Sequence, residues 1–312
     1  MSHHAERNRR EFLQAAALGA VATASHGLVG AADDEPPLII DCHAHIYGED
    51  EQKYPTIENP YRPPEGTGTV AHLKREMDAA GVRYVTAIQT STFYRFDNRF
   101  TADSSRDNRE FGAVVCTLNP DDRASPAMLR KYAEDYNVRG MRSIPAASGK
   151  LDDPGVAALW STAEELGIVI NVLVNADKQV EIETLVDRHP KLNVVIDHCL
   201  NIKAVPTAAP TVKAMQALAE LPTLHAKLSF IPTGTAEEYP FRDMHEPCHA
   251  VIEAFGPQRC VWGSDFPCEL WCPNVSYADH LKLFTHELGL SDSAQRAILG
   301  ETPKRLWFAD RA

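Results

Sequence analysis

Hydrophobic runs alternate with amphipathic stretches along the chain from Pro37 onward. The runs are short and rich in β-branched residues, as expected for parallel strands that are buried on both faces. The stretches between them repeat their apolar residues at helical spacing. The eight predicted strands are Leu38–His43, Val82–Thr90, Gly112–Leu118, Val138–Ile144, Ile168–Val174, Asn193–Cys199, Leu224–Phe230 and Cys260–Phe266.

Capping residues mark several of the predicted helices. A helix over Thr69–Ala80 ends before Gly81, and Ser125–Tyr136 begins with a serine N-cap followed by a proline. The remaining predicted helices are Pro154–Leu166, Lys178–His189 and Tyr277–Leu288. Strands that alternate with helices in one chain, without a linker, favour a single (β/α)8 TIM barrel of the α/β class. An open doubly wound sheet would usually carry a Gly-rich phosphate turn after its first strand, and the sequence has none there.

The N-terminal segment has the character of a targeting signal. Asn8–Gln14 (NRREFLQ) precedes the uncharged, alanine-rich run Ala15–Ala24. Twin arginines before a short apolar region resemble a twin-arginine export signal, and the alternative is a short amphipathic helix. The run is too short to span a bilayer stably. We expect residues 1–37 to be signal and linker, and residues 38–312 to be a barrel exported to the periplasm without a transmembrane anchor.

Composition narrows the range of partners. A net charge of −12 argues against a nucleic-acid partner, because phosphate binding needs clustered lysine and arginine. Seven cysteines without paired spacing do not indicate a disulfide framework. The segments Glu49–Gly68 and Phe93–Asn108 are expected to be loops that shape a small-molecule pocket, because barrel active sites lie on the face that such loops cover. The sequence does not indicate an oligomeric state.

Polar residues gather where the predicted strands end. His43 and His45 lie at the end of the first strand and share one face, because strand side chains alternate. Asp265 lies at the end of the eighth strand, and the active site of a (β/α)8 barrel lies at these carboxyl ends. The other polar residues at strand ends are Arg142, Asn171, Asn175, His198, Lys227 and Ser229. Each alone could be structural, but three imidazoles and a carboxylate on one rim indicate a catalytic site.

Five segments resemble signature segments of the amidohydrolase superfamily, in its amidohydrolase-related branch of lactone hydrolases and decarboxylases. They are IIDCHAH, VRGMR, VVIDHC, HAKLS and VWGSDFP, which fall in order on the predicted strands, and the closing ILGETPKRLW resembles the final helix of that branch. The resemblance implies that His43, His45 and Asp265 bind a divalent metal, with zinc expected. It also implies that Asp265 accepts a proton from the attacking water, and that His198 is a further ligand or polarises the substrate.

One position departs from the metal-dependent pattern. Those members carry a histidine at the end of the fifth strand, where this chain has Leu173. The neighbouring Asn171 and Asn175 are poor zinc ligands. Lactonase-like members tolerate the loss, and in that arrangement the histidines orient the carbonyl while Asp265 activates water directly. The departure therefore favours a lactonase and weakens the expectation of a metal.

We expect a hydrolase that cleaves a lactone or ester C–O bond in a small carboxylate or sugar-derived substrate. Asp265 and His198 are the expected catalytic residues. Arg142, Lys227 and Asn171 are the expected substrate-binding residues, with Arg142 holding a carboxylate or the developing oxyanion. For Lys227, an ion pair with a neighbouring acid is an equal alternative. The rival functions are a metal-dependent decarboxylase of an aromatic or enoic acid and a catalytically weakened binding barrel.

Two further sequence patterns contain possible metal ligands or reactive cysteines. The segment His245–His249 (HEPCH) matches the H-E-x-x-H zinc-protease pattern. Pro247 is tolerated only in the first turn of a helix, so we expect His245 to lie outside the helix that follows. Cys268 and Cys272 follow Asp265 at a spacing that suits neither a zinc knuckle nor a redox pair, so we expect a surface disulfide or unpaired loop cysteines.

Overall fold

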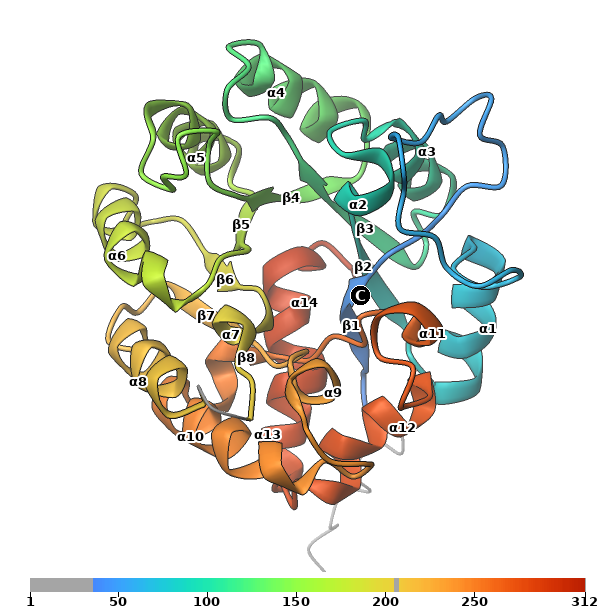
Figure 1. The fold of residues 1–312 in the computed structure, drawn as a ribbon, viewed down its shortest axis with the longest axis vertical. Coiled ribbons are helices and arrows are strands. Elements are labelled where there is room, and N and C mark those ends of the chain that lie inside the picture. Colours follow the sequence, from blue (N-terminus) through green and yellow to red (C-terminus); the bar gives the residue numbers. More distant parts are fainter. Residues whose placement is uncertain (1–35, 205–207, 312) are drawn as a thin grey trace, which may run out of the picture. The chain divides into compact units, whose positions relative to one another are not determined.

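The computed structural model describes residues 36–204 and 208–311. Its centre is an eight-stranded parallel sheet in the order β1 to β8, which curls into a barrel surrounded by helices (Figure 1). The strands are β1 Ile40–Ala44, β2 Tyr84–Ile88, β3 Gly112–Thr117, β4 Val138–Ser143, β5 Val169–Val172, β6 Val194–Ile196, β7 Leu224–Lys227 and β8 Cys260–Val261. All eight predicted strands are present, and the predicted (β/α)8 barrel is confirmed. The twin-arginine segment lies outside the described residues.

The barrel closes where β1 meets residues 262–266, a contact that we call the β1–β8 seam. Cys42 N donates to Trp262 O at 3.0 Å, and Asp265 N donates to His43 O at 2.9 Å. Ala44 forms a parallel bridge with Phe266. Because β8 itself is only two residues long, these backbone bonds beyond it complete the barrel.

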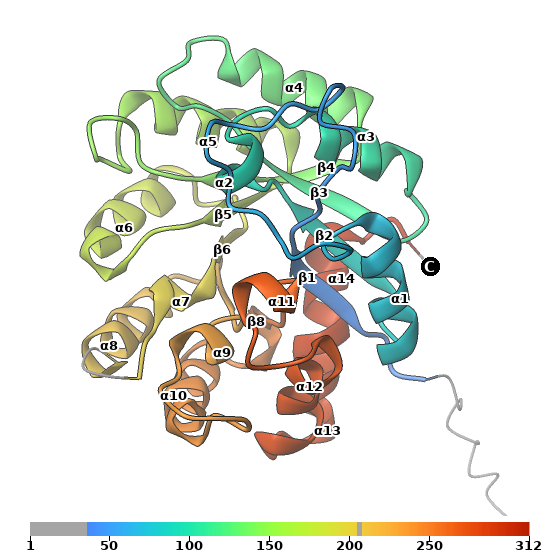
Figure 2. The same cartoon turned by 45° about the vertical axis from the view of Figure 1, so that its right-hand side comes forward.

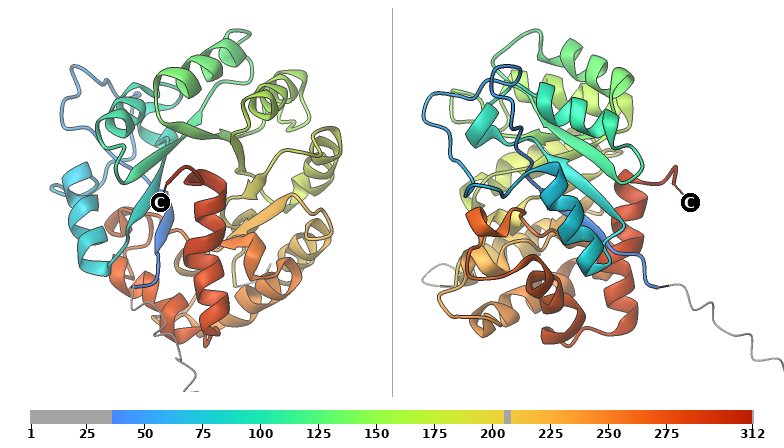
Figure 3. Two further views of the ribbon diagram at one scale, coloured as in Figure 1. Left: turned by 180° about the vertical axis from the view of Figure 1, so that it is seen from behind. Right: turned by 90° about the vertical axis from the view of Figure 1, so that its right-hand side faces the viewer.

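Helices cover the outside of the barrel (Figures 1 and 3). The longer ones are α1 Val70–Ala80, α3 Arg99–Asp107, α4 Ser125–Asp135, α5 Pro154–Leu166, α6 Gln179–Arg188, α8 Ala208–Leu218 and α10 His245–Phe255. The predicted stop is present at α1, where Gly81 adopts a left-handed φ of 71°, and Thr69 is its N-cap, with Oγ1 accepting from His72 N. The predicted N-cap of α4 is wrong, because Ser125 is the first residue of that helix and its hydroxyl donates to Asn119 O at 2.6 Å. None of the described helices is both long enough and apolar enough to cross a membrane.

The C-terminal helices follow β8, and the last of them covers the end of the barrel where the strands begin. They are α12 Tyr277–Lys282, the π-helical η4 Leu283–Glu287, α13 Asp292–Arg296, the π-helical η5 Ala297–Glu301 and α14 Thr302–Trp307. Trp307 and Phe308 pack with Ile40 and Cys42 in one buried cluster. In Figure 3, α14 runs across the barrel when the molecule is seen from behind. The opposite end therefore holds the open rim.

Short helical turns surround that open rim. They are α2 Ser91–Tyr94, η1 Ala176–Lys178, α7 His198–Asn201, α9 Ile231–Gly234 and α11 Cys268–Trp271, each of which follows the carboxyl end of a strand. Two other turns lie elsewhere in the chain order: η2 Arg242–Met244 precedes α10, and η3 Pro257–Arg259 leads into the start of β8. Figure 2 shows α11 beside β1 and β8, and the Glu49–Gly68 segment passing α2 before it returns to α1.

Several expectations were wrong. The Phe93–Asn108 segment is not a loop but contains α3, whose polar sequence buries small residues such as Thr101 and Ala102 in place of a hydrophobic stripe. His245 does not lie outside the helix but is the first residue of α10, with Pro247 in its first turn. The imidazole Nε2 of His245 donates to Pro240 O at 2.7 Å.

The two cysteines after Asp265 also differ from one of the two expectations for them. Cys268 and Cys272 form no surface disulfide, because both thiols are free and buried. Each donates weakly to the carbonyl oxygen of Ser264, at 3.8 and 3.7 Å. They therefore pack beneath the segment that carries Asp265.

Candidate active site

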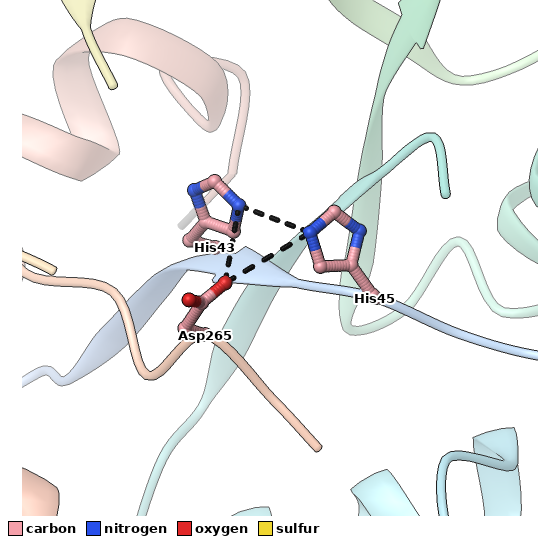
Figure 4. A group of neighbouring side chains, drawn as sticks. All are labelled: His43, His45 and Asp265. Atoms are coloured by element: carbon pink, nitrogen blue, oxygen red, sulfur yellow. Dashed lines mark hydrogen bonds and ion pairs between the residues drawn. The ribbon is translucent and has the colours of Figure 1, made fainter. Parts of the chain in front are cut away.

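Three side chains that the sequence placed at strand ends converge at the open rim (Figure 4). His43 Nε2 lies 3.3 Å from His45 Nε2 and 3.5 Å from Asp265 Oδ1. His45 Nε2 lies 3.9 Å from the same carboxylate oxygen. All three side chains are buried. The three residues predicted to bind a metal are therefore close enough to coordinate one ion.

The β1–β8 seam brings these residues together. Asp265 has a φ of 57°, a left-handed conformation that costs a non-glycine residue energy and that is held here by its backbone bond to His43. Gly263 lies so close to β1 that an added Cβ would be 2.6 Å from His43 Cβ. Only glycine permits this approach without displacing the histidine.

Asp41 holds the two sides of the β1–β8 seam together. Its Oδ1 accepts from the backbone N–H groups of His43 at 3.0 Å and Ser264 at 2.9 Å. Its Oδ2 accepts from the hydroxyls of Ser264 at 2.6 Å and Tyr277 at 3.0 Å. Burial raises the pKa of Asp41, although each of these hydrogen bonds lowers it. The seam is therefore held by a buried carboxyl group with neutral donors only.

Hydrogen bonding and burial set the state of the histidines. His45 Nδ1 lies 3.0 Å from Ile88 O, and because a carbonyl only accepts, Nδ1 carries the proton and Nε2 keeps its lone pair. Burial lowers the pKa of both His43 and His45 well below its usual value, and nearby cations lower it further. Both imidazoles are therefore neutral and suited to bind an electrophile.

The three residues predicted to bind substrate share a partner that the sequence reasoning missed. Asp197, immediately after β6, accepts from Arg142 Nε at 3.0 Å, Lys227 Nζ at 2.8 Å and Asn171 Nδ2 at 3.1 Å. Burial would raise the pKa of Asp197, but the charges of Lys227 and Arg142 outweigh it and hold the pKa well below its usual range. For Lys227, the alternative of an ion pair with an acid is confirmed.

The two cations also contact a predicted metal ligand. Arg142 Nη2 lies 2.9 Å from His43 Nε2, and Lys227 Nζ lies 3.4 Å from His43 Nδ1. A neutral imidazole has one acceptor nitrogen, and a guanidinium can only donate, so the shorter contact makes Nε2 the acceptor. Arg142, itself paired with Asp197, thus positions His43, whereas the Nδ1–H group of His43 cannot accept a hydrogen bond from Lys227 Nζ. Direct substrate contact by Arg142, Lys227 and Asn171 stays a prediction.

His198 lies beside the converging residues without joining them. Its ring centroid is 4.5 Å from that of His43, and its Nδ1 hydrogen-bonds with Ser229 Oγ at 2.9 Å. Burial lowers the pKa of His198 to about 4, so it is neutral. Among the described residues, the group whose donor atoms could hold one ion consists of His43, His45 and Asp265. The geometry therefore suits His198 to polarising a substrate better than to binding that ion.

The end of the fifth strand supplies no ligand to this group. Leu173 stands directly after β5, with an apolar side chain. Asn175 is exposed and accepts from Asn201 Nδ2 at 2.8 Å, so its predicted place on the site face is wrong. Asn171 is buried and its amide donates to Asp197.

Asp265 has the character of a proton acceptor. Burial raises its pKa to about 7, although Arg142 opposes the shift. A carboxyl group in this range can take up and release a proton near neutral pH, as a general base must.

The donor set also fits a metal. Ligands at about 2.0 Å from a tetrahedral zinc ion lie roughly 3.3 Å apart. The observed separations of 3.3, 3.5 and 3.9 Å are close to that value. Three protein ligands leave one position for water or substrate, which is typical of catalytic and not of structural zinc.

Curated proteins align with most of this chain. The chain is 24% identical to an L-fucono-1,5-lactonase of Burkholderia ambifaria over 241 residues, which cover 73% of this chain and 80% of that protein. It is 26% identical to a 4-sulfomuconolactone hydrolase of Rhizobium radiobacter over 243 residues, which cover 73% and 75%.

Solved structures share the fold. A probable 2-pyrone-4,6-dicarboxylic acid hydrolase from Acinetobacter baumannii has a TM-score of 0.74 at 18% identity, covering 86% of this chain and 98% of that one. An amidohydrolase from Burkholderia multivorans with bound zinc has a TM-score of 0.69 at 24% identity, covering 86% and 99%. The model of the family described as Amidohydrolase matches residues 40–309. The chain therefore belongs to the amidohydrolase family of enzymes.

Proposed function

We propose that this enzyme hydrolyses a lactone. The observation that carries the proposal is the convergence of His43, His45 and Asp265 in a family member whose curated relatives are named as lactone hydrolases. The family also contains other activities, but these relatives align with most of this chain. The missing histidine at Leu173 further favours lactone opening over decarboxylation.

The geometry supports a general-base reaction. The Asp265 carboxylate takes a proton from water as the water oxygen forms a bond to the lactone carbonyl carbon. The ring C–O bond then breaks, and the proton returns from Asp265 to the leaving alkoxide oxygen. One water is consumed and a hydroxy acid is released, so atoms and charge balance.

Neutral histidines and paired cations support the developing oxyanion. His198 lies beside His43 and is free to donate through the ring nitrogen that does not face Ser229. Arg142 keeps donors beyond the Nε group that binds Asp197, so it can approach the same oxygen. Preorganised donors in a buried site stabilise such charge more strongly than water does.

We propose that His43 Nε2, His45 Nε2 and Asp265 hold a divalent metal, with zinc as the first candidate. The neutral state of both histidines, their separations and the zinc in the B. multivorans structure support this choice. When bound, the metal would polarise the carbonyl and make water easier to deprotonate. Arg142 would then have to release His43 Nε2, because one lone pair cannot serve both.

One experiment tests the function and the metal together. The purified protein is analysed for bound metal, and acid release from a panel of lactones is followed with and without a chelator. We expect lactone opening, a stoichiometric divalent metal and loss of activity with the chelator. Loss of CO2 from an aromatic acid, with every lactone and ester untouched, would instead establish the decarboxylase. Binding without turnover of either class would indicate a weakened barrel.

We also propose export to the periplasm and a small-molecule substrate as the partner. The twin arginines before an uncharged apolar run support the first, and the net charge of −12 weighs against nucleic acid. Replacing Arg9 and Arg10 by lysine should keep the protein in the cytoplasm in a cell-fractionation experiment. A variant that is exported as well as the wild type would contradict the signal.

A further inference from the structure

The short helix that carries His198 has the opposite hand to an ordinary helix. In α7 the φ angles of the four residues from His198 to Asn201 are 52°, 47°, 60° and 58°. Left-handed φ angles are unfavourable for residues other than glycine, and where they occur they are normally single. Four in succession therefore mark a strained turn. Strain of this kind persists only where the surrounding structure holds it in place.

The end of β7 holds three consecutive residues at the start of this turn. Lys227 Nζ lies 2.8 Å from Asp197 Oδ1, to which it donates. The hydroxyl of Ser229, two residues after Lys227, hydrogen-bonds with His198 Nδ1 at 2.9 Å. The thiol of Cys199 donates to Lys227 O at 3.2 Å. The residues on both sides of His198 are thus bonded to the same lysine, one to its side chain and the other to its backbone.

The Cys199 thiol is suited to a permanent structural bond. Its side chain is fully buried, and burial raises the pKa of the thiol well above its usual value. The thiol therefore stays protonated and keeps its hydrogen for the carbonyl oxygen of Lys227. A buried, protonated thiol is a poor nucleophile, so Cys199 is not suited to attack a substrate itself.

The far end of the turn is held by residues that follow β5. Asn201 Nδ2 donates to Asn175 Oδ1 at 2.8 Å and to Val174 O at 3.4 Å. Between the two ends, Leu200 is buried in the hydrophobic core. The turn packs against β7 and against α8, beside which it lies in Figure 2. Side-chain bonds therefore hold the turn at both ends.

The hand of the turn decides where the His198 ring lies. Backbone φ and ψ set the direction of the Cβ atom, so a change of φ to negative values would turn the imidazole away from its present place. In that place its ring centroid is 4.5 Å from that of His43. The position of the proposed oxyanion donor therefore depends on the turn staying left-handed.

We propose that Cys199 and Asn201 are positioning residues for lactone hydrolysis. They keep the turn left-handed and so hold the His198 imidazole beside His43, while neither of them touches the reacting atoms. This inference rests on the proposed function, in which His198 stabilises the developing oxyanion. A displacement of about 1 Å in a group of this kind lowers the rate by up to about 10²-fold, so small changes in the turn are measurable.

Removal of the thiol gives the first test. Cys199→Ala loses the buried donor to Lys227 O, and we expect kcat on the best lactone to fall about 10-fold with KM changed less than about 2-fold. Cys199→Ser keeps a donor at this position and should have a kcat within about 3-fold of the wild type. Cys116→Ala, on β3, is the matched control. It removes an equally buried thiol from another strand and should leave kcat unchanged.

Glycine at the far end of the turn gives the second test. Glycine adopts a positive φ without strain, so Asn201→Gly removes the side-chain bonds and still permits the turn. We expect kcat to fall about 3-fold while the melting temperature changes by less than about 2 °C. If Asn201 only stabilised the fold, this variant would keep the kcat of the wild type.

A third test asks whether both residues act through His198. His198→Phe removes the proposed oxyanion donor, and we expect it to lower kcat about 10²-fold. When Cys199→Ala or Asn201→Gly is added to His198→Phe, kcat should fall no further, because the group that they position is already absent.

An NMR measurement follows the His198 ring without depending on lactone hydrolysis. The imidazole C–H signal of His198 is identified by its loss in His198→Phe. We expect this signal to shift or broaden in Cys199→Ala and in Asn201→Gly, and to match the wild type in Cys116→Ala. Thermal melts show which variants are folded, and Asn201→Gly carries the test if Cys199→Ala does not fold.

The outcomes separate this inference from the proposed function. If the wild type opens no lactone, the proposed function fails, and the NMR signal still decides whether the two residues hold His198. Folded variants with the kcat and the His198 signal of the wild type would overturn the inference. So would a further loss of rate when either change is added to His198→Phe, because the effect would then not pass through His198.

Discussion

Two buried carboxylates near the rim are satisfied in opposite ways. Asp41, in the β1–β8 seam, accepts from two backbone N–H groups through one oxygen and from two hydroxyls through the other. Asp197, after β6, accepts from a guanidinium, an ammonium and an amide, all of which can only donate. Hydroxyls can reverse their role, and the donors around Asp197 cannot.

The two carboxylates therefore have different roles. Asp41 fixes the backbone of the β1–β8 seam, and Asp197 neutralises two buried cations. The Asp41 network needs a hydrogen-bonding group of the right shape but does not need a negative charge. Burial in fact disfavours the charged form, because it raises the pKa of Asp41. The Asp197 network needs the charge itself, because two buried cations would otherwise be unpaired. The following predictions test this contrast from the largest expected effect to the smallest.

Asp265 belongs to neither network, and its replacement should have the largest effect on activity. Asp265→Asn cannot accept a proton, so we expect lactone hydrolysis to fall by about 10³-fold or more while the fold persists. Kinetics on the best lactone and a circular-dichroism melt measure the two quantities. A folded variant with wild-type turnover would end the general-base mechanism.

Isosteric replacement of the two network carboxylates should differ sharply. In Asp41→Asn the amide oxygen can face the backbone donors while the amide nitrogen donates to the hydroxyls, so we expect a loss of about 1 kcal/mol of unfolding free energy. In Asp197→Asn the amide nitrogen faces an obligate donor and both cations lose their counter-charge, so we expect about 3–5 kcal/mol. Denaturant titration measures both, and equal losses would refute the contrast.

Lowering the pH should change the contributions of Asp41 and Asp197 to folding stability in opposite directions. The pKa of Asp41 is raised in the folded state, so the folded protein takes up a proton before the unfolded chain does. The stability of the wild type relative to Asp41→Asn should therefore increase as pH falls toward the unfolded value of 3.8.

The pKa of Asp197 is lowered, so its contribution is fully present above the unfolded value of 3.8 and is lost only below it. The stability of the wild type relative to Asp197→Asn should stay constant from pH 7 to about pH 4 and then decline. Denaturant titrations at several pH values give both differences. The same trend for both pairs would show that the two networks are electrostatically alike.

The smallest expected effect is at a hydroxyl of the seam. Tyr277→Phe removes one of four donors to Asp41 and leaves the others in place, so we expect a loss of about 0.5 kcal/mol of unfolding free energy. Activity should change little, because Tyr277 touches no residue of the converging group. A large loss of activity at unchanged stability would place the seam in the chemistry.

The strands were predictable because buried parallel strands leave compact β-branched runs in the sequence. Two of the longer helices were not. The sequence of α3 has few apolar residues, and α8 carries Pro210 near its start, so neither has the pattern of an ordinary amphipathic helix. In the structure α3 packs against β2 and β3, and α8 packs against α10. This tertiary contribution to helix stability is not visible in a local pattern.

The site was predictable where the signal was local and not where it depended on distant partners. His43 and His45 stand two apart on one strand, and Asp265 ends another. Asp197 stands in the quoted segment VVIDHC, yet its partners are up to 55 residues away, and only the barrel brings them together. Its signal was a charged residue inside an apolar run, which must find a partner when buried.

The β1–β8 seam makes the active site a late product of synthesis. Ser264 and Asp41, which it joins, are separated by 223 residues, so the first and last strands must meet before the converging group exists. During translation the histidines of β1 emerge early and wait without their carboxylate partner until nearly the whole barrel has been made. A nascent chain therefore has no site at which to hold an ion or open a lactone. The enzyme can therefore become active only after the barrel has closed.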